Sequence, residues 1–176
     1  MEPVIAADDD TEILIRLLSN EYCARAVDLI LPIQQKEFNV PITLEQQPDL
    51  LDIEGFYIRP GGGFWGAFSQ GKLVGTIALI DIGHHAGAIR KMFVKQEFRG
   101  KQFGIAQRLL ETLVEYCVSH QMADLYLGTV NVMKAAHRFY ERNGFRRMEK
   151  GALPGYFPLM SADNLFYHLH LDNHLI

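Results

Sequence analysis

The hydrophobic spacing of this sequence changes at Gly104, and that change constrains the fold most strongly. Before it, two apolar runs at residues 64–68 and 73–80 flank a short glycine-containing loop, which predicts a β-hairpin. A third run, residues 88–94, follows a glycine-rich turn and predicts another antiparallel strand. From Gly104 onward the apolar residues recur at helical spacing, so a long amphipathic helix must follow the sheet directly.

This helix has one apolar face and one polar face. The apolar face comprises Ile105, Ala106, Leu109, Leu110, Leu113, Val114, Cys117 and Val118. A compact strand is predicted next, over residues 124–129. A strand–helix–strand order needs a crossover, which is right-handed by the usual rule and makes the two strands a parallel or splayed pair.

The remaining segments complete an alternation of strands and helices. Further strands are predicted over residues 12–18, 145–148 and 164–171, and further helices over residues 21–38, 43–57 and 134–142. We expect Ser19 or Asn20 to cap the first of these helices, which Pro32 kinks or breaks. The second is interrupted near Gly55, and residues 143–144 end the third, because either residue tolerates the left-handed conformation. The fold class is therefore α/β, with a mixed, twisted sheet of six or seven strands and helices on both faces.

Composition indicates one globular domain over residues 1–176. Hydrophobic residues make up 48% of the chain and charged residues 22%. A net charge of −4 argues against a nucleic-acid partner, and no apolar run is long enough for a membrane partner. The acidic segment near Met1 is unlike a signal peptide, and Cys23 and Cys117 form no motif, so we expect a cytoplasmic protein. A homodimer is left open.

The segment that precedes the long helix combines glycines with cations. Arg99, Gly100, Lys101 and Gly104 lie within six residues of one another. A helix N-terminus offers unpaired N–H groups and a partial positive charge, and it is therefore a natural site for phosphate. The patterns GxxxxGK[ST] and GxGxxG are absent, and a plain flexible helix start is the alternative interpretation.

Two segments resemble the GNAT superfamily of N-acetyltransferases. Residues 94–106, which contain Arg-Gly and then Gly-Ile-Ala, resemble its coenzyme-A-binding motif. Residues 136–145 resemble its second signature, an alanine followed by a hydrophobic–Tyr pair and a terminal Gly-Phe. The resemblance implies a GNAT-like acyl-CoA N-acyltransferase fold, acetyl-CoA as co-substrate, and no metal.

The chain departs from the family pattern at three places. Residues 102–103 are two extra residues in the loop if the helix register is kept, and Lys101 then stands where Gln or Arg is usual. Ala88 occupies the place of a glutamate early in the preceding strand. Met133 stands where an asparagine is common, and Asn131 is the nearest replacement.

The resemblance also implies a set of site residues. The coenzyme-binding set is Met92, Phe93, Val94, Arg99, Gly100, Lys101, Gln102, Phe103, Gly104, Ile105, Ala106, Asn131 and Tyr140. A strand N–H near Phe93 or Val94 would polarise the thioester carbonyl. Tyr140 is implied as the catalytic general acid, because a phenol can protonate a departing thiolate whose pKa is roughly 8.5. A tyrosine that only packs in the core is the alternative.

The resemblance also implies a small-molecule or peptide amine as acceptor, which would attack acetyl-CoA directly in a ternary complex. No general base is assigned, although Asp81, His84, His85 and Glu97 are expected near the cleft. A catalytically silent acyl-CoA sensor on the same fold is the alternative function, and transfer of a longer acyl chain is a third. Product formation over a panel of amines would separate the enzyme from the sensor.

Metal binding is not predicted from the sequence. The adjacent pair at residues 84–85 and the pair His168 and His170 each lack a third ligand at diagnostic spacing. Histidines on turns or on solvent-facing strand positions explain both pairs.

Overall fold

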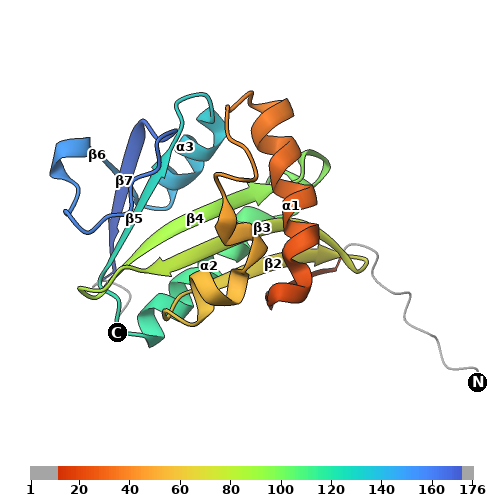
Figure 1. Cartoon of the computed structure of the whole chain (residues 1–176), viewed down its shortest axis with the longest axis horizontal. Helices are drawn as coiled ribbons and strands as arrows, with labels where there is room; N and C mark the ends of the chain where they lie inside the picture. Colours follow the sequence, from red (N-terminus) through yellow and green to blue (C-terminus); the bar gives the residue numbers. More distant parts are fainter. Residues whose placement is uncertain (1–11, 172–176) are drawn as a thin grey trace, which may run out of the picture.

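Seven strands form one mixed sheet in the computed structural model, which describes residues 12–171 (Figure 1). The strands are β1 (Ile13–Leu17), β2 (Gly63–Ser69), β3 (Lys72–Asp81), β4 (Ala86–Val94), β5 (Asp124–Thr129), β6 (Arg146–Met148) and β7 (Leu165–His170). Their order across the sheet is β1-β2-β3-β4-β5-β7-β6. In this described range, β4 and β5 pair in parallel and the other neighbours pair antiparallel. The predicted mixed sheet is confirmed.

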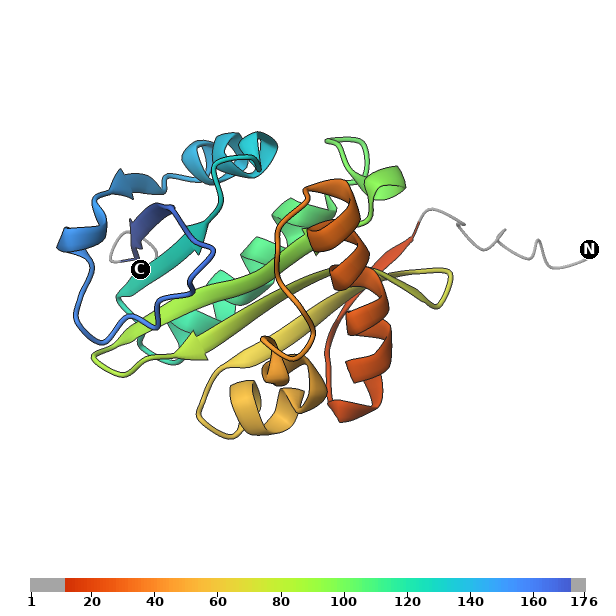
Figure 2. The same cartoon turned by 45° about the horizontal axis from the view of Figure 1, so that its top comes forward.

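Helices cover both faces of the sheet, as predicted (Figure 2). The α-helices are α1 (Cys23–Pro32), α2 (Ile105–Ser119) and α3 (Lys134–Arg142). Shorter 3-10 turns cover Asn20–Tyr22, Pro48–Leu51, Gln96–Phe98 and Lys150–Ala152, and π-helical turns cover Ile33–Glu37 and Glu54–Ile58. One core joins α2 and α3 to a face of the sheet around Ile77 and Leu125. A second core joins α1 and the Glu54–Ile58 turn to the opposite face around Phe64 and Ala78.

The long helix follows the predicted pattern closely. It starts at Ile105, and the residues of its apolar face that are fully buried are Ile105, Leu109, Leu110, Leu113 and Cys117. The hairpin, the strand at residues 124–129 and the helix at residues 134–142 are also confirmed. Gly144, with a φ of 88°, follows α3 in the left-handed conformation. No helix in the described part of the chain is both long and apolar enough to cross a membrane. The acidic N-terminal segment lies outside the described residues.

The predicted cap of the first helix is wrong. Ser19 forms no side-chain cap bond. Asn20 instead accepts a hydrogen bond from the Glu54 backbone N–H at 2.9 Å and donates one to the Asp52 carboxylate at 3.0 Å. The Asn20 side chain, which sequence rules assign to the helix start, therefore bonds instead to a segment more than thirty residues away.

The helical region predicted over residues 43–57 is also wrong in extent. It contains only two short turns, and they are separated at Asp52 rather than at Gly55. The Asp52 carboxylate accepts a hydrogen bond from the Gly55 N–H at 3.0 Å, so it satisfies a free amide at the start of the second turn. Pro32 does end the first α-helix, which continues as a π-helical turn, so the predicted interruption is confirmed there.

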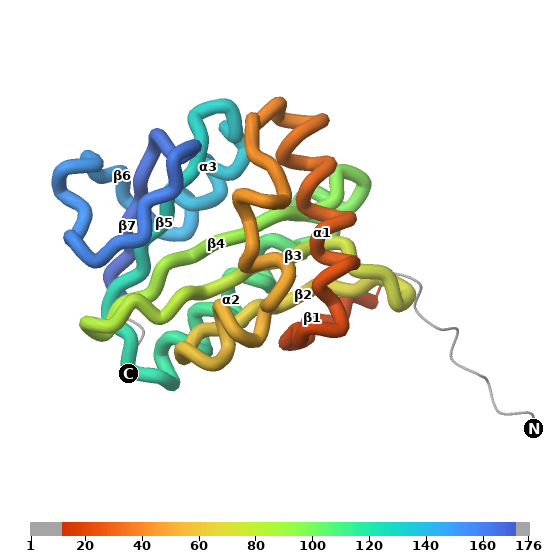
Figure 3. The backbone as a smooth tube through the Cα atoms, in the orientation of Figure 1, coloured from red at the N-terminus to blue at the C-terminus, as the bar shows by residue number. Residues whose placement is uncertain are grey.

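The two central strands separate partway along their length (Figure 3). Pairing between β4 and β5 runs from Ala86 with Asp124 to Ile89 with Leu127 and then stops. Beyond Ile89, β4 stays paired with β3 as far as Val94, while β5 stays paired with β7. Each central strand therefore keeps one partner and presents its other edge to the gap.

A β-bulge in β4 lies where the strands separate. The register between β3 and β4 shifts between Thr76 and Ala78, so β4 carries an extra residue there. Lys91, in this bulge, has a φ of 52°, which is rare for a residue with a side chain. The Thr76 hydroxyl donates to the Lys91 carbonyl at 2.7 Å and holds the bulged backbone in place.

Candidate active site

The loop that leaves β4 enters α2 through a left-handed glycine. Gly104 has a φ of 62° and immediately precedes the first helical residue, Ile105. A Cβ at this position would meet nothing closer than the Lys101 carbonyl, at 4.0 Å, so backbone conformation rather than space favours glycine. Residues 101–103 form a turn, and α2 keeps the helix register in which Gly104 opens the helix.

The N-terminus of α2 carries no side-chain cap. The first backbone N–H groups of an α-helix have no partner within the helix, and the helix dipole places partial positive charge beside them. An anionic group of a ligand can therefore bind at Ile105 and Ala106 without displacing a capping side chain, whereas the Gly104 N–H already donates to the Gly100 carbonyl at 3.3 Å.

Arg99 is already engaged inside the protein. Its guanidinium forms a bidentate ion pair with Glu37, one branch of which measures 2.9 Å. Its Nε also donates to the Val94 carbonyl at 2.8 Å, and the guanidinium lies 5.8 Å from the centre of the Phe38 ring. Arg99 thus fastens the end of β4 to the turn after α1, and its contact with a coenzyme stays a prediction.

A cavity of about 120 Å³ lies where β4 and β5 separate. Its lining comes from β4, from the end of β5, from α3, from the turn after α1 and from the segment before β7. Among the predicted site residues, Met92, Phe93 and Tyr140 line it. Val94, Asn131 and the loop residues 99–106 lie outside this lining.

Tyr140 reaches the cavity from α3. Its side chain is 5% exposed and packs edge-on against Phe145, with ring centres 5.6 Å apart, and against Tyr167 at 5.8 Å. Burial raises the pKa of Tyr140 well above its ordinary value, and the charge of Asp163 raises it further. The phenol therefore keeps its proton at neutral pH and can act only as a donor there.

Asp163 is a cavity residue that the sequence analysis missed. Burial raises the pKa of its carboxyl to about 6, although Arg90 and Lys91 oppose the shift. The carboxylate lies against the backbone of Gly128 on β5, where a Cβ would be 2.4 Å from Oδ2. A carboxyl that titrates near neutrality in a cavity is a candidate for proton transfer.

Lys91 extends from the bulge into a network of buried polar groups. Its ammonium lies 3.6 Å from an Asp49 carboxylate oxygen and donates to the side-chain oxygen of Gln47. Gln47 in turn exchanges amide hydrogen bonds with Gln34, and Tyr57 donates to Asp49. Burial lowers the pKa of Lys91, while Asp49 raises it. The network joins the irregular segment after α1 to the wall of the cavity.

The lining of the cavity carries more positively charged than negatively charged side chains. Arg90, whose guanidinium donates to the Pro158 carbonyl at 2.6 Å, joins Lys91 as the second cation. Asp163 is the carboxylate of the lining, whereas Asp49 stands behind Lys91 and outside it. The described lining therefore contains two cations and one carboxylate, and one of the two cations, Lys91, is already paired with Asp49.

The titratable residues that were expected near the cleft lie elsewhere. Asp81 is the last residue of β3, and His84 and His85 belong to the turn that leads into the start of β4, before its cavity-lining residues 89–93. Glu97 lies 4.0 Å from Lys95 in an exposed ion pair. None of these four lines the described cavity.

Comparison with known proteins settles the family. A model of the "Acetyltransferase (GNAT) family" matches residues 27–145. This chain belongs to that family. It is thus a member of a family of acyltransferase enzymes, and the expected fold class is confirmed.

Individual relatives give more detail. A crystal structure of a GNAT-family acetyltransferase from Staphylococcus aureus has a TM-score of 0.88 and 37% identity, covering 92% of this chain and 100% of that one. Human N-acetylaspartate synthetase is 37% identical over 126 residues, which are 69% of this chain and 41% of that protein. This chain spans less than half the length of the N-acetylaspartate synthetases that it matches. The paiA N-acetyltransferase of Thermoplasma acidophilum, solved with coenzyme A, has a TM-score of 0.71 at 18% identity over 90% of this chain and 99% of that one, and shares the fold.

The raised pKa of Asp163 leads to a prediction about stability. Below pH 3.8 the carboxyl is protonated in both folded and unfolded chains. Between pH 3.8 and about 6 the folded chain binds the proton more tightly, so stability falls as pH rises through this window. Asp163→Asn should therefore raise the free energy of unfolding at pH 7 by about 1–3 kcal/mol, and should give no gain below pH 4.

Urea unfolding across this pH range measures the effect. Asp28→Asn is the matched control, because it removes an exposed carboxylate from α1. Equal stability of the Asp163→Asn variant and the parent at pH 7 would contradict the prediction.

Proposed function

We propose that this chain is an N-acetyltransferase that moves an acetyl group from acetyl-CoA to the amine of a small anionic acceptor. An acidic amino acid fits the site best. The observation that carries the proposal is the cavity between the separated strands, where Tyr140, Asp163, Arg90 and Lys91 meet. The similarity to enzymes named N-acetylaspartate synthetase supports the same acceptor class.

The coenzyme would bind along the end of β4 and over the start of α2. The pyrophosphate would lie on the N–H groups of Ile105 and Ala106, close to the backbone of Gly104 and beside Lys101. The pantetheine amides would pair with the free edge of β4 at residues 92–94, as an added strand would. A backbone N–H near Phe93 or Val94 would polarise the thioester carbonyl.

The acceptor would occupy the cavity by charge complementarity. An acidic amino acid carries one ammonium and two carboxylates, and the lining carries one carboxylate and two cations. Its carboxylates would pair with Arg90 and Lys91, while its amine would lie beside Asp163. A guanidinium binds a carboxylate through two parallel hydrogen bonds, so Arg90 would supply most of the orientation.

The reaction needs two protons to leave the ammonium nitrogen and one to reach the sulfur. Asp163 would take the first proton and pass it to water, which leaves a neutral amine. This amine attacks the thioester carbon in a ternary complex, and Asp163 accepts the second proton as the new bond forms. As the C–S bond breaks, Tyr140 donates to the thiolate, whose pKa is roughly 8.5. Burial makes Tyr140 a weaker acid than a free phenol, so its donation depends on the negative charge that develops on sulfur. The products are the acetamide and free coenzyme A.

Replacing Tyr140 by phenylalanine tests the proton donor. We expect kcat for thiol release to fall about 100-fold, because general acid catalysis typically contributes 10²–10⁴-fold. Coenzyme affinity, measured by calorimetry, should stay within about twofold, because packing of the ring is kept. Tyr22→Phe, on the other side of the sheet, is the control. Unchanged turnover in Tyr140→Phe would remove this residue from the mechanism.

Replacing Arg90 by glutamine tests the acceptor class. We expect KM for aspartate or glutamate to rise at least tenfold, because a charge-assisted pair is worth about 1.5–3 kcal/mol. KM for acetyl-CoA should be unchanged. Arg59→Gln removes an exposed cation outside the cavity and should leave both constants unchanged. Preference of the parent chain for polyamines over acidic amines in a thiol-release panel would overturn the acceptor assignment.

Replacing Gly104 by glutamate tests the pyrophosphate site. A carboxylate at the start of α2 would repel the phosphates and strain the left-handed backbone, so coenzyme affinity should fall at least tenfold. Gly71→Glu is the control, because Gly71 also has a positive φ, of 76°, in open space on the β2–β3 turn. Intact affinity in Gly104→Glu would contradict binding at this helix.

A silent sensor is the competing function, and one result separates it from the enzyme. Acetyl-CoA binding in the micromolar range without thiol release on any amine of the panel would favour the sensor. If Gly104→Glu still weakened coenzyme binding in that case, the proposed coenzyme site would stand and only the proposed acetyl transfer would be wrong.

A further inference from the structure

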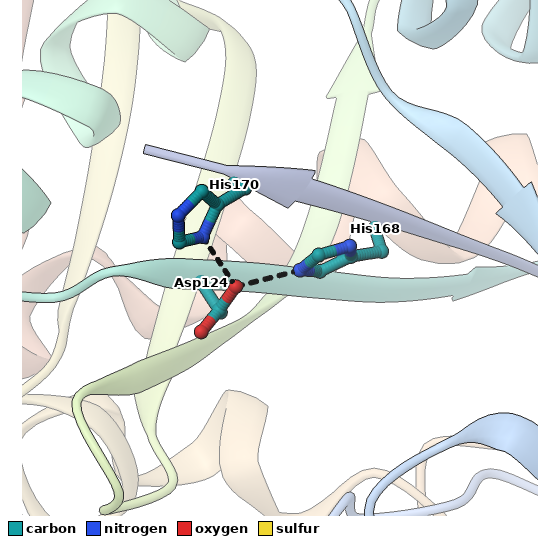
Figure 4. A group of neighbouring side chains, drawn as sticks. All are labelled: Asp124, His168 and His170. Atoms are coloured by element: carbon teal, nitrogen blue, oxygen red, sulfur yellow. Dashed lines mark hydrogen bonds and ion pairs between the residues drawn. The ribbon is translucent and has the colours of Figure 1, made fainter. Parts of the chain in front are cut away.

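Three side chains of metal-ligating type meet on β5 and β7 (Figure 4). One carboxylate oxygen of Asp124 lies 2.7 Å from Nε2 of His168 and 2.9 Å from Nδ1 of His170. The three ligand atoms all lie within 4.8 Å of one another. Among the residues that the structure describes, these three are the His, Cys, Asp and Glu side chains that lie close enough together to hold one metal ion.

The sheet register brings the three residues together. Asp124 pairs directly with His170 across the antiparallel β5–β7 ladder, and Tyr126 pairs with His168. Side chains two residues apart point to the same face of a sheet, so Asp124 faces both histidines. The third ligand that the sequence lacked comes from a strand 44 residues before His168.

The ligand set and the spacing suit a divalent transition metal. Imidazole nitrogens and a carboxylate oxygen bind Zn²⁺ at about 2.0–2.2 Å, which sets neighbouring ligand atoms roughly 3 Å apart. Both contacts to Asp124 are already near that spacing, so only the gap between the two rings has to adjust. The side chains are 29%, 33% and 51% exposed for Asp124, His168 and His170, so an ion can enter and keep water as its remaining ligand.

Neighbouring groups orient the cluster. The His168 ring stacks on Tyr126, with centres 4.8 Å apart and planes 25° apart, which limits its rotation as an outer-shell partner would. Arg146 stands opposite His168 on β6 and is exposed. Its charge opposes a bound cation, but water screens an exposed charge strongly.

We propose that Asp124, His168 and His170 bind one divalent transition-metal ion of the Zn²⁺ class, with water completing the coordination. The ion would tie the start of β5 to the end of β7. Asp124 lies roughly 17 Å along β5 from Thr129 at the cavity. The ion would therefore stabilise the pairing of the two strands and take no part in acetyl transfer.

Calorimetric titration of the full chain with Zn²⁺, after removal of metals with a chelator, tests the site. We expect one ion per chain with a dissociation constant in the micromolar range. Asp124→Asn and His170→Ala should each weaken binding at least tenfold. His120→Ala, which removes an exposed histidine that stacks on Tyr116 of α2, should leave the affinity within twofold.

Thermal unfolding provides a second measurement. Zn²⁺ should raise the Tm of the parent chain and of His120→Ala, and should leave that of His170→Ala unchanged. Because His170 is half-exposed, this variant is expected to fold, and its circular dichroism spectrum checks that it does. Binding of Zn²⁺ by the parent that is no tighter than binding by His170→Ala would overturn the proposal.

Discussion

The separation of β4 from β5 is the constraint on which the rest of the site depends. Two parallel strands that stayed paired would satisfy each other's backbone groups and leave no space between them. Here the ladder stops after Ile89 and Leu127, and the bulge at Lys91 turns β4 away while β3 still holds it. The result is a free strand edge beside a cavity, which is what a ligand with its own amide groups can use.

The cavity is built from segments with very different degrees of regularity. Two walls are sheet strands and one is α3, and these place Tyr140, Arg90 and Lys91 on stiff backbone. The other walls are irregular, and polar contacts hold part of them. The buried Lys91–Asp49–Gln47 network and the partly exposed Arg99–Glu37 ion pair both hold the segment that follows α1. Buried ion pairs are weak evidence for stability, but they fix which loop lies where.

Local patterns predicted the regular elements well, because periodicity reports which face of a helix or strand is buried. The stripe from Ile105 to Cys117 and the alternation in the central strands needed no tertiary information. Asn20 shows the limit, since its amide bonds to the distant residues Asp52 and Glu54 rather than to a backbone N–H of its own helix. The insertion of β7 between β5 and β6 is likewise a long-range pairing that no local pattern encodes.

The site was predictable where a motif marked it and not elsewhere. Tyr140, which lines the cavity, could be named from the sequence because a signature surrounds it, and its role as proton donor stays a prediction. Asp163 lies in a stretch without periodicity, and it becomes unusual only through burial beside a strand that is distant in sequence. In the sequence Lys91 looks like an ordinary strand cation, and only the bulge in the structure directs its side chain inward. The place of Asp163 is in turn determined by what β5 lacks: at Gly128 a single additional carbon atom would fill the volume that the carboxylate occupies. Glycine at position 128 therefore contributes to the site through the side chain that it lacks, because the missing Cβ leaves room for a carboxylate from another segment.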